Sequence, residues 1–262
     1  MTDRIQQAFR GHKAFIPFLT CGDPDLAATA ELVRTLDQNG ADLIELGIPF
    51  SDPTAEGPVI QGANLRALSQ GTTTARVLEM VAGLQGQVKA PLVFMTYANV
   101  VFSYGPQRFA AHCREAGVSG LILPDVPFEE KEEFAAPCRE QGLALISMVA
   151  PTSGPERAAA IAREAEGFLY IVSSLGVTGQ RGQFPPQLGQ LAGAVRQASP
   201  VPCAIGFGVS SPQQAAQLAG LADGVIVGSA LVELIGQYGR QAAPQVAAFA
   251  AGIRRALDGA GQ

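Results

Sequence analysis

The sequence predicts an α/β fold, a closed (β/α)8 TIM barrel with an extra N-terminal helix. Two observations indicate it: eight short apolar runs recur along the chain, and a helical stretch follows each of them. The chain length is a third observation, because 262 residues suit one barrel domain over residues 1–262. An open doubly wound sheet is the alternative, but that fold usually has a glycine-rich fingerprint after its first strand, and "TCGDPD" is not one.

The eight apolar runs are continuous rather than alternating, as expected of parallel strands that are covered on both faces. They occupy residues 14–20, 42–47, 91–97, 120–125, 143–150, 168–174, 203–208 and 224–229. The intervening segments have helix patterns. The first, "DPDLAATAELVRTLDQNGA", opens on an acidic cap and closes on Asn39 and Gly40. In a barrel of this kind the functional residues lie at the carboxyl ends of the strands.

Composition excludes several classes of function. The net charge is −5 and no basic block occurs, so we do not expect nucleic acid as a main partner. A small anionic ligand is still compatible, because backbone amides bind phosphate without net positive charge. No run approaches membrane-spanning length and the N-terminus lacks a signal-peptide core, so we expect no membrane association and a cytoplasmic protein.

The cysteines and histidines do not suggest a metal site. No pair of cysteines has the spacing of metal ligands, which predicts four buried free thiols in a reducing compartment. The four are Cys21, Cys113, Cys138 and Cys203. His12 and His112 lie away from the strand ends, and we expect both to be structural or solvated.

Three late segments predict a phosphate site. They are "GVTGQRG" at 176–182, "GFGVSS" at 206–211 and "VGSALV" at 227–232. Glycine lets the backbone approach a ligand closely, and a Gly-Ser pair at a helix N-terminus offers free amides and a hydroxyl. Because the loops after the seventh and eighth strands usually bind phosphate in this barrel, the sequence predicts a small phosphorylated ligand.

Carboxylates provide the candidate chemistry. Glu45 lies inside an apolar strand, and neighbouring runs offer no Lys or Arg to pair with it, so we expect an acid at the barrel mouth with a raised pKa. Asp52 and Glu56 follow in the next loop; Asp52 either orders the turn or faces a partner. Two acids facing one cavity suit proton shuttling. A Schiff-base lysine is disfavoured, because none of the eight runs contains Lys.

The segment "ELGIPFSDPTAEGPVIQGANLRA" resembles the signature of the tryptophan synthase alpha chain family. Further motifs match in the family's order and spacing: "FIPFLTCGDPD", "MTYANVVFSYG", "LILPDVPFEE", "LYIVSSLGVTG", "AIGFGVSSPQQ" and "GVIVGSALV". The resemblance implies a carbon–carbon lyase of L-tryptophan biosynthesis. Such an enzyme splits indole-3-glycerol phosphate into indole and glyceraldehyde 3-phosphate by acid–base retro-aldol chemistry, without a cofactor of its own. Another phosphate-binding barrel, such as an isomerase, is disfavoured by the full-length match.

The resemblance also implies roles for particular residues. Glu45 matches the strand glutamate that protonates carbon 3 of indole and then accepts a hydroxyl proton. Glu56 matches the loop aspartate that holds the indole N–H. The remaining matches are binding residues: Phe18, Tyr170, Thr178 and Phe207 for the substrate, and Gly179, Gly208, Gly228 and Ser229 for its phosphate.

Position 56 departs from the family, which has aspartate where this chain has glutamate. An extra methylene shifts a carboxylate by roughly 1–1.5 Å, and such misplacement can cost on the order of 100-fold in rate. The alternative interpretation is therefore a weakened chain that acts mainly as an activating subunit.

The family works as an α2β2 tetramer, in which pyridoxal phosphate belongs to the beta chain. By resemblance, Pro49, Asp52 and Asn99 would contact that partner.

Overall fold

The computed structural model describes residues 2–173, 186–206 and 208–260. Within them, nine parallel strands form one sheet in the order β5-β4-β3-β2-β1-β9-β8-β7-β6. The strands are β1 (Ala14–Thr20), β2 (Ile44–Gly47), β3 (Leu92–Met95), β4 (Gly120–Ile122), β5 (Ala144–Ile146), β6 (Met148–Val149), β7 (Leu169–Val172), β8 (Cys203–Gly206) and β9 (Gly224–Val227).

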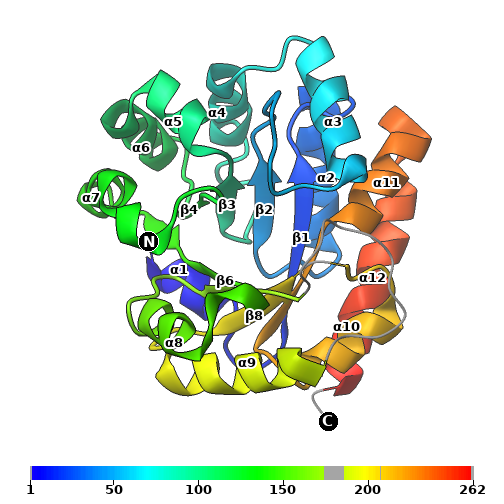
Figure 1. The fold of residues 1–262 in the computed structure, drawn as a ribbon. Coiled ribbons are helices and arrows are strands. Elements are labelled where there is room, and N and C mark those ends of the chain that lie inside the picture. Colours follow the sequence, from blue (N-terminus) through cyan, green and yellow to red (C-terminus); the bar gives the residue numbers. More distant parts are fainter. Residues whose placement is uncertain (1, 174–185, 207, 261–262) are drawn as a thin grey trace.

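The barrel closes through the fifth predicted run, which the structure divides into β5 and β6 at Ser147. On one side of this run, the Ala144 amide donates to the Ser119 carbonyl at 3.1 Å. On the other side, the Tyr170 amide donates to the Ser147 carbonyl at 3.0 Å. The two ends of the sheet therefore meet in one continuous segment, and the eight predicted runs correspond to the nine strands of a barrel (Figure 1).

Twelve α-helices and three short 3-10 helices are present in the described residues, and most of the α-helices surround the barrel (Figure 1). The α-helices are α1 (Thr2–Gln7), α2 (Leu26–Gln38), α3 (Pro58–Ser69), α4 (Thr74–Ala82), α5 (Ala98–Tyr104), α6 (Pro106–Glu115), α7 (Glu132–Glu140), α8 (Pro155–Arg163), α9 (Pro186–Ala198), α10 (Pro212–Ala219), α11 (Ser229–Tyr238) and α12 (Ala243–Ala260). The 3-10 helices are η1 (Phe128–Glu130), η2 (Pro151–Ser153) and η3 (Gly239–Gln241). As predicted, α2 is capped by the Asp25 side chain and ends at Asn39.

Each strand is buried on both faces, which explains why the apolar runs do not alternate. On β1, Ile16 and Phe18 pack inside the barrel, whereas Phe15 and Leu19 pack against the outer helices. On β2, Ile44 and Leu46 pack outward. Because successive side chains of a strand point to opposite faces, Glu45 points into the barrel.

The extra N-terminal helix closes the amino-terminal end of the barrel. Ile5 belongs to the inner core, and a Cβ on Gly120, at the start of β4, would lie 3.2 Å from its Cδ1 atom. Phe9 follows α1 and packs on Phe168 with ring centroids 5.8 Å apart. With one end filled in this way, the opposite, carboxyl end of the strands is left for a site.

The four cysteines are free and buried, as the sequence predicted. Both histidines have hydrogen-bond partners: His12 Nε2 lies 2.8 Å from Asp42, and His112 Nδ1 lies 2.7 Å from the Tyr104 hydroxyl. Among the described residues, no helix combines the length and the apolar character needed to cross a membrane.

Candidate active site

A small cavity of about 50 Å³ lies at the carboxyl ends of the strands and collects most of the predicted site residues. Residues from both ends of the sequence line it together: Phe18, Glu45, Glu56, Tyr170, Gly208, Gly228 and Ser229. Thr178, Gly179 and Phe207 lie outside the described residues. The cavity therefore brings two acids, two aromatic rings and two glycine segments to one place.

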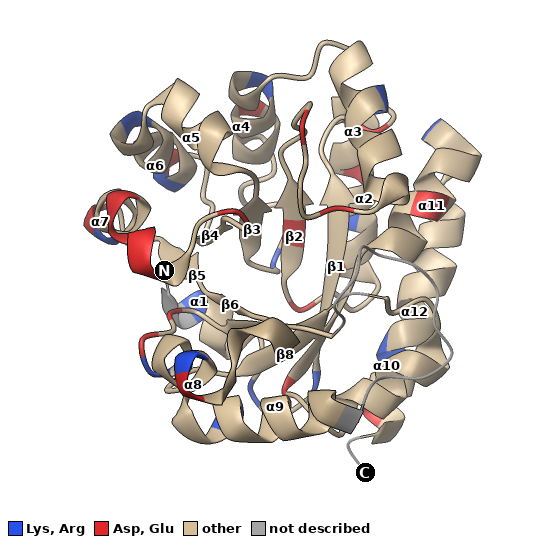
Figure 2. Cartoon of the chain, in the orientation of Figure 1, with Lys and Arg blue, Asp and Glu red and all other residues tan. Residues whose placement is uncertain are grey.

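Glu45 is the buried acid of this cavity. Its side chain is 1% exposed, and Oε2 has no hydrogen-bond partner in the described part of the chain. In Figure 2 a red segment crosses β2, the strand that carries Glu45. Burial, together with the nearby charge of Glu56, raises the pKa of Glu45 from 4.5 to about 8. Glu45 is thus protonated at neutral pH and can donate a proton.

Glu56 is the second acid and lies in the loop between β2 and α3. Asn64 Nδ2 donates to its Oε2 atom at 2.6 Å. The Tyr97 hydroxyl accepts a hydrogen bond from the Ala55 amide at 3.1 Å and also bonds to the Glu56 carboxylate. Burial raises the pKa of Glu56 to about 7, although the bonds from Asn64 and Tyr97 oppose this rise. Glu56 therefore ionises more readily than Glu45.

Aromatic rings form the inner wall of the cavity. Phe18 on β1 lies over Gly47: a Cβ added to Gly47 would lie 2.6 Å from the Cζ atom of the Phe18 ring. Tyr170 on β7 is fully buried, and both its burial and the charge of Glu45 raise its pKa well above 10. The phenol of Tyr170 therefore stays neutral, and together with Phe18 it gives Glu45 an apolar surrounding that suits a flat ring.

Another part of the cavity has the features of an anion site. Gly228 precedes Ser229, the first residue of the ten-residue helix α11, and both residues line the cavity. The first amides of a helix have no partner within the helix, so this helix start offers donors to an anion in the cavity. Gly208, with φ of +78°, lines the same cavity after β8. A Cβ on Gly228 would lie 3.5 Å from Phe18, so the anion site directly adjoins the aromatic wall.

The three predicted partner-contact residues differ in exposure. Asp52 and Asn99 are exposed, whereas Pro49 is buried. The Ser51 hydroxyl donates to the Asp52 carboxylate, which orders the loop before Glu56. Asp52 and Asn99 are thus accessible to another chain, and Pro49 acts in this structure as part of the loop's packing.

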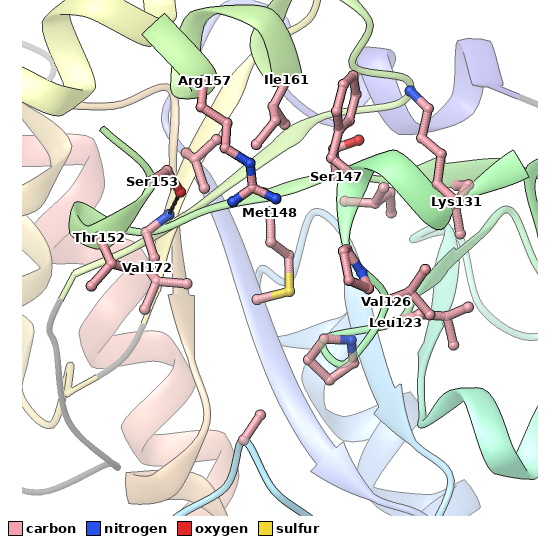
Figure 3. A pocket seen from close by; sticks show the side chains of 18 residues that line it. Leu123, Val126, Lys131, Ser147, Met148, Thr152, Ser153, Arg157, Ile161 and Val172 are labelled. Carbon is pink, nitrogen blue, oxygen red and sulfur yellow. Dashed lines mark hydrogen bonds between the residues drawn. The ribbon is translucent and has the colours of Figure 1, made fainter. Parts of the chain in front are cut away.

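A larger cavity of about 460 Å³ adjoins this site, and the two share Ala55 and Pro124. Figure 3 shows side chains that line the larger cavity, among them Met148, Arg157 and Val172. Its cations are already paired: Arg157 bonds to Glu129 at 2.7 Å and Lys131 bonds to Glu164 at 2.9 Å. No acid lines it among the described residues. The larger space consequently lacks the groups for proton transfer, and the smaller cavity is the candidate active site.

Sequence reasoning missed several residues of the smaller cavity. Met95 and Ile226 lie at or next to the carboxyl ends of β3 and β9, on the inner face. Their strand positions were the available signal. Tyr97 had the same signal, because it ends the third predicted run. Asn64 had none, because its bond to Glu56 depends on how the loop folds back onto α3.

The donor set does not resemble a metal centre. Across the described ranges, no three His, Cys, Asp or Glu side chains gather as metal ligands. The site is instead two carboxylates of different pKa, an aromatic wall and an anion-binding helix end. This arrangement can protonate one atom of a bound molecule while holding its phosphate.

Comparisons with known proteins agree with this geometry. A family model described as "Tryptophan synthase alpha chain" matches residues 5–258. The chain is similar to the tryptophan synthase alpha chain of Lactiplantibacillus plantarum, at 48% identity over 259 residues, which cover 99% of this chain and 97% of the relative. It is also similar to that of Microcystis aeruginosa, at 49% identity over 225 residues, which cover 86% and 85%.

Solved structures give the same result. The tryptophan synthase subunit alpha from Legionella pneumophila str. Paris matches with a TM-score of 0.89 and 37% identity, covering 98% of both chains. A structure of Mycobacterium tuberculosis tryptophan synthase matches with a TM-score of 0.87 and 37% identity, covering 98% of this chain and 96% of the other. The likeness thus covers nearly the whole chain in both sequence and fold.

Proposed function

The chain belongs to the tryptophan synthase alpha chain family, and from this premise we propose that Glu45 and Glu56 catalyse the cleavage of indole-3-glycerol phosphate into indole and glyceraldehyde 3-phosphate. The observation that carries the proposal is that one cavity is lined by two acids, Glu45 and Glu56, together with the Gly228–Ser229 helix start. The activity is that of a carbon–carbon lyase.

The proposed reaction begins with a proton. Glu45 protonates carbon 3 of the indole ring, which gives an indolenine with positive charge on the ring nitrogen. Glu56, as a carboxylate, accepts the N–H hydrogen bond and stabilises that charge. One charge-assisted contact of this kind is worth about 3 kcal/mol of barrier. This step makes the ring an electron acceptor.

The second step breaks the carbon–carbon bond. Glu45, now ionised, removes the proton of the glycerol hydroxyl next to the ring. The hydroxyl oxygen forms the aldehyde, and the electrons of the broken bond return to the ring nitrogen and restore the aromatic indole. Glu45 ends protonated, so the cycle consumes no proton and is carried by this chain's own acids.

Substrate binding follows from the walls of the cavity. Phe18 and Tyr170 flank the indole ring, and Gly208, Gly228 and Ser229 hold the phosphate through amides and a hydroxyl. Phe207, Thr178 and Gly179 complete this assignment by resemblance to the family.

A tryptophan synthase beta chain is the proposed partner, in an α2β2 tetramer. Asp52 and Asn99 are exposed and suit such a contact, in a loop that also holds Pro49. We assign pyridoxal phosphate to that partner, since the steps above use carboxylates alone. Four free thiols suit a reducing compartment, and we place the protein in the cytoplasm.

The test is direct product analysis. The purified chain is incubated with indole-3-glycerol phosphate, with and without a beta chain, and both products are quantified. The proposal expects indole and glyceraldehyde 3-phosphate in equal amounts, and faster release with the partner present. Absence of both products in both conditions would contradict it.

A further inference from the structure

We propose that Asn64 is a positioning residue that sets the place and the ionisation of the Glu56 carboxylate. The inference deepens the proposed function and rests on it for its kinetic consequences. Asn64 is buried, with 4% exposure, on α3, and its amide donates to Glu56 Oε2 at 2.6 Å. A hydrogen bond donated to an ionised carboxylate is stronger than one between neutral groups, so this contact favours the charged form of Glu56.

Helix geometry explains why Asn64 reaches Glu56. Helix α3 begins at Pro58, two residues after Glu56. Asn64 lies nearly two turns into the helix, and side chains of a helix tilt toward its N-terminus. The amide of Asn64 therefore points back to the loop that precedes the helix.

Helix α3 is itself anchored, so Asn64 does not simply follow the loop. Two residues beyond Asn64, Arg66 donates from Nε and NH2 to both carboxylate oxygens of Asp23, each at 2.8 Å. Asp23 is 2% exposed and lies just after β1. Because a bidentate pair of this kind fixes direction as well as distance, α3 is tied to the barrel end.

The second contact of the Glu56 carboxylate comes from Tyr97. The Tyr97 hydroxyl accepts the Ala55 amide hydrogen, so its own hydrogen is available for the Glu56 carboxylate. Tyr97 and Asn64 thus hold the longer glutamate side chain between β3 and α3. Because the Glu56 carboxylate is bonded to both residues, its longer side chain is held in one position despite the extra methylene.

The experiment measures the Glu56 carboxyl directly. Its pH midpoint is followed by carbon-13 NMR in the ligand-free chain, with Glu56→Gln used to assign the signal. The titratable groups around the Glu56 carboxyl are Glu45 on β2 and Tyr97, which follows β3. The charge of Asp125 contributes to the raised pKa of Tyr97. Asn64→Leu keeps the branched shape of the side chain but removes the donor, so the midpoint should rise by about one pH unit, the effect of one hydrogen bond to a charged group.

A matched control is present on the same helix. Gln61 is exposed and donates to the backbone carbonyl of Glu56 at 2.8 Å, not to its carboxylate. Gln61→Leu should leave the midpoint unchanged. If Asn64→Leu does not fold, as judged by circular dichroism, Asn64→Ala provides the same loss of the donor with a shorter side chain.

Kinetics supply the second measurement. If Asn64 positions Glu56, kcat for indole release should fall about tenfold in Asn64→Leu, with KM changed little. An unchanged Glu56 midpoint in a folded Asn64 variant would overturn the inference. If the wild-type chain releases no indole, the proposed function fails, but the NMR midpoints still decide whether Asn64 controls Glu56.

Discussion

Phe18 on β1 and Glu45 on β2 are register partners in the parallel ladder of the barrel. Both side chains point inward and line the same cavity, so the ladder places an aromatic ring directly beside the buried acid. This neighbour contributes to the burial that keeps Glu45 protonated. The acid chemistry of the site therefore follows from strand register, and several consequences can be measured.

The pH dependence of kcat/KM should be bell-shaped with a narrow maximum. The reaction needs Glu56 ionised, so activity should fall as the pH drops through about 7. It needs Glu45 protonated, so activity should also fall as the pH rises through about 8. Steady-state rates measured from roughly pH 5.5 to roughly pH 9.5, a range that brackets both pKa values, check this prediction. A flat profile across the range would contradict the assignment.

Because of Glu45, the free energy of unfolding should fall as the pH rises. Its folded pKa of about 8 exceeds its usual 4.5, so its stabilising contribution is complete below about 4.5 and is lost as the pH rises through about 8. Glu45→Gln should therefore raise the free energy of unfolding at alkaline pH by on the order of a few kcal/mol, and change it little at acid pH. Denaturant unfolding at both pH values measures this. Equal effects at the two pH values would show that Glu45 is not buried as an acid.

Much of this site could be predicted from the sequence. Glu45 stood out as a lone acid in an apolar strand, and the Gly228–Ser229 pair stood out by its position after the eighth run. Both signals are local, because burial of a strand and the start of a helix are visible in short patterns. The division of the fifth run at Ser147 was not predictable, because a single serine inside the apolar run "LALISMVA" does not signal a break in a strand. Asn64 could not be found either, since its bond depends on a tertiary contact.

Position 56 decides between a working lyase and a mainly activating subunit. Because Asn64 and Tyr97 already hold the longer carboxylate, Glu56→Asp should raise kcat/KM less than tenfold, about 1.4 kcal/mol. Glu56→Gln should lower it about 100-fold, the usual scale for a lost electrostatic partner. Indole release by the complex with a beta chain is the assay. A gain of 100-fold or more in Glu56→Asp would instead favour the activating subunit.

The contact between Gly47 and Phe18 should be sensitive to a single methyl group. A Cβ on Gly47 would lie 2.6 Å and 2.9 Å from two atoms of the Phe18 ring, so the ring must shift from its place in the cavity wall. We expect Gly47→Ala to cost about 1–3 kcal/mol of stability and to raise KM for the substrate. Gly220→Ala is the control, because its new Cβ would meet its nearest atom at 3.7 Å, an ordinary contact. Similar KM values in the two variants would argue against Phe18 as a wall of the binding site.

The most direct test of the account is indole release from indole-3-glycerol phosphate by Glu45→Gln, compared with the unaltered chain, each with a saturating beta chain. Glutamine keeps the shape of Glu45 but cannot exchange a proton. The account predicts that turnover falls by about 10²–10⁴-fold, the range for loss of a general acid–base group, while the substrate still binds. If the variant instead retained roughly a tenth or more of the activity, the loss would be too small for a general acid–base group. That result would contradict the central role given to Glu45.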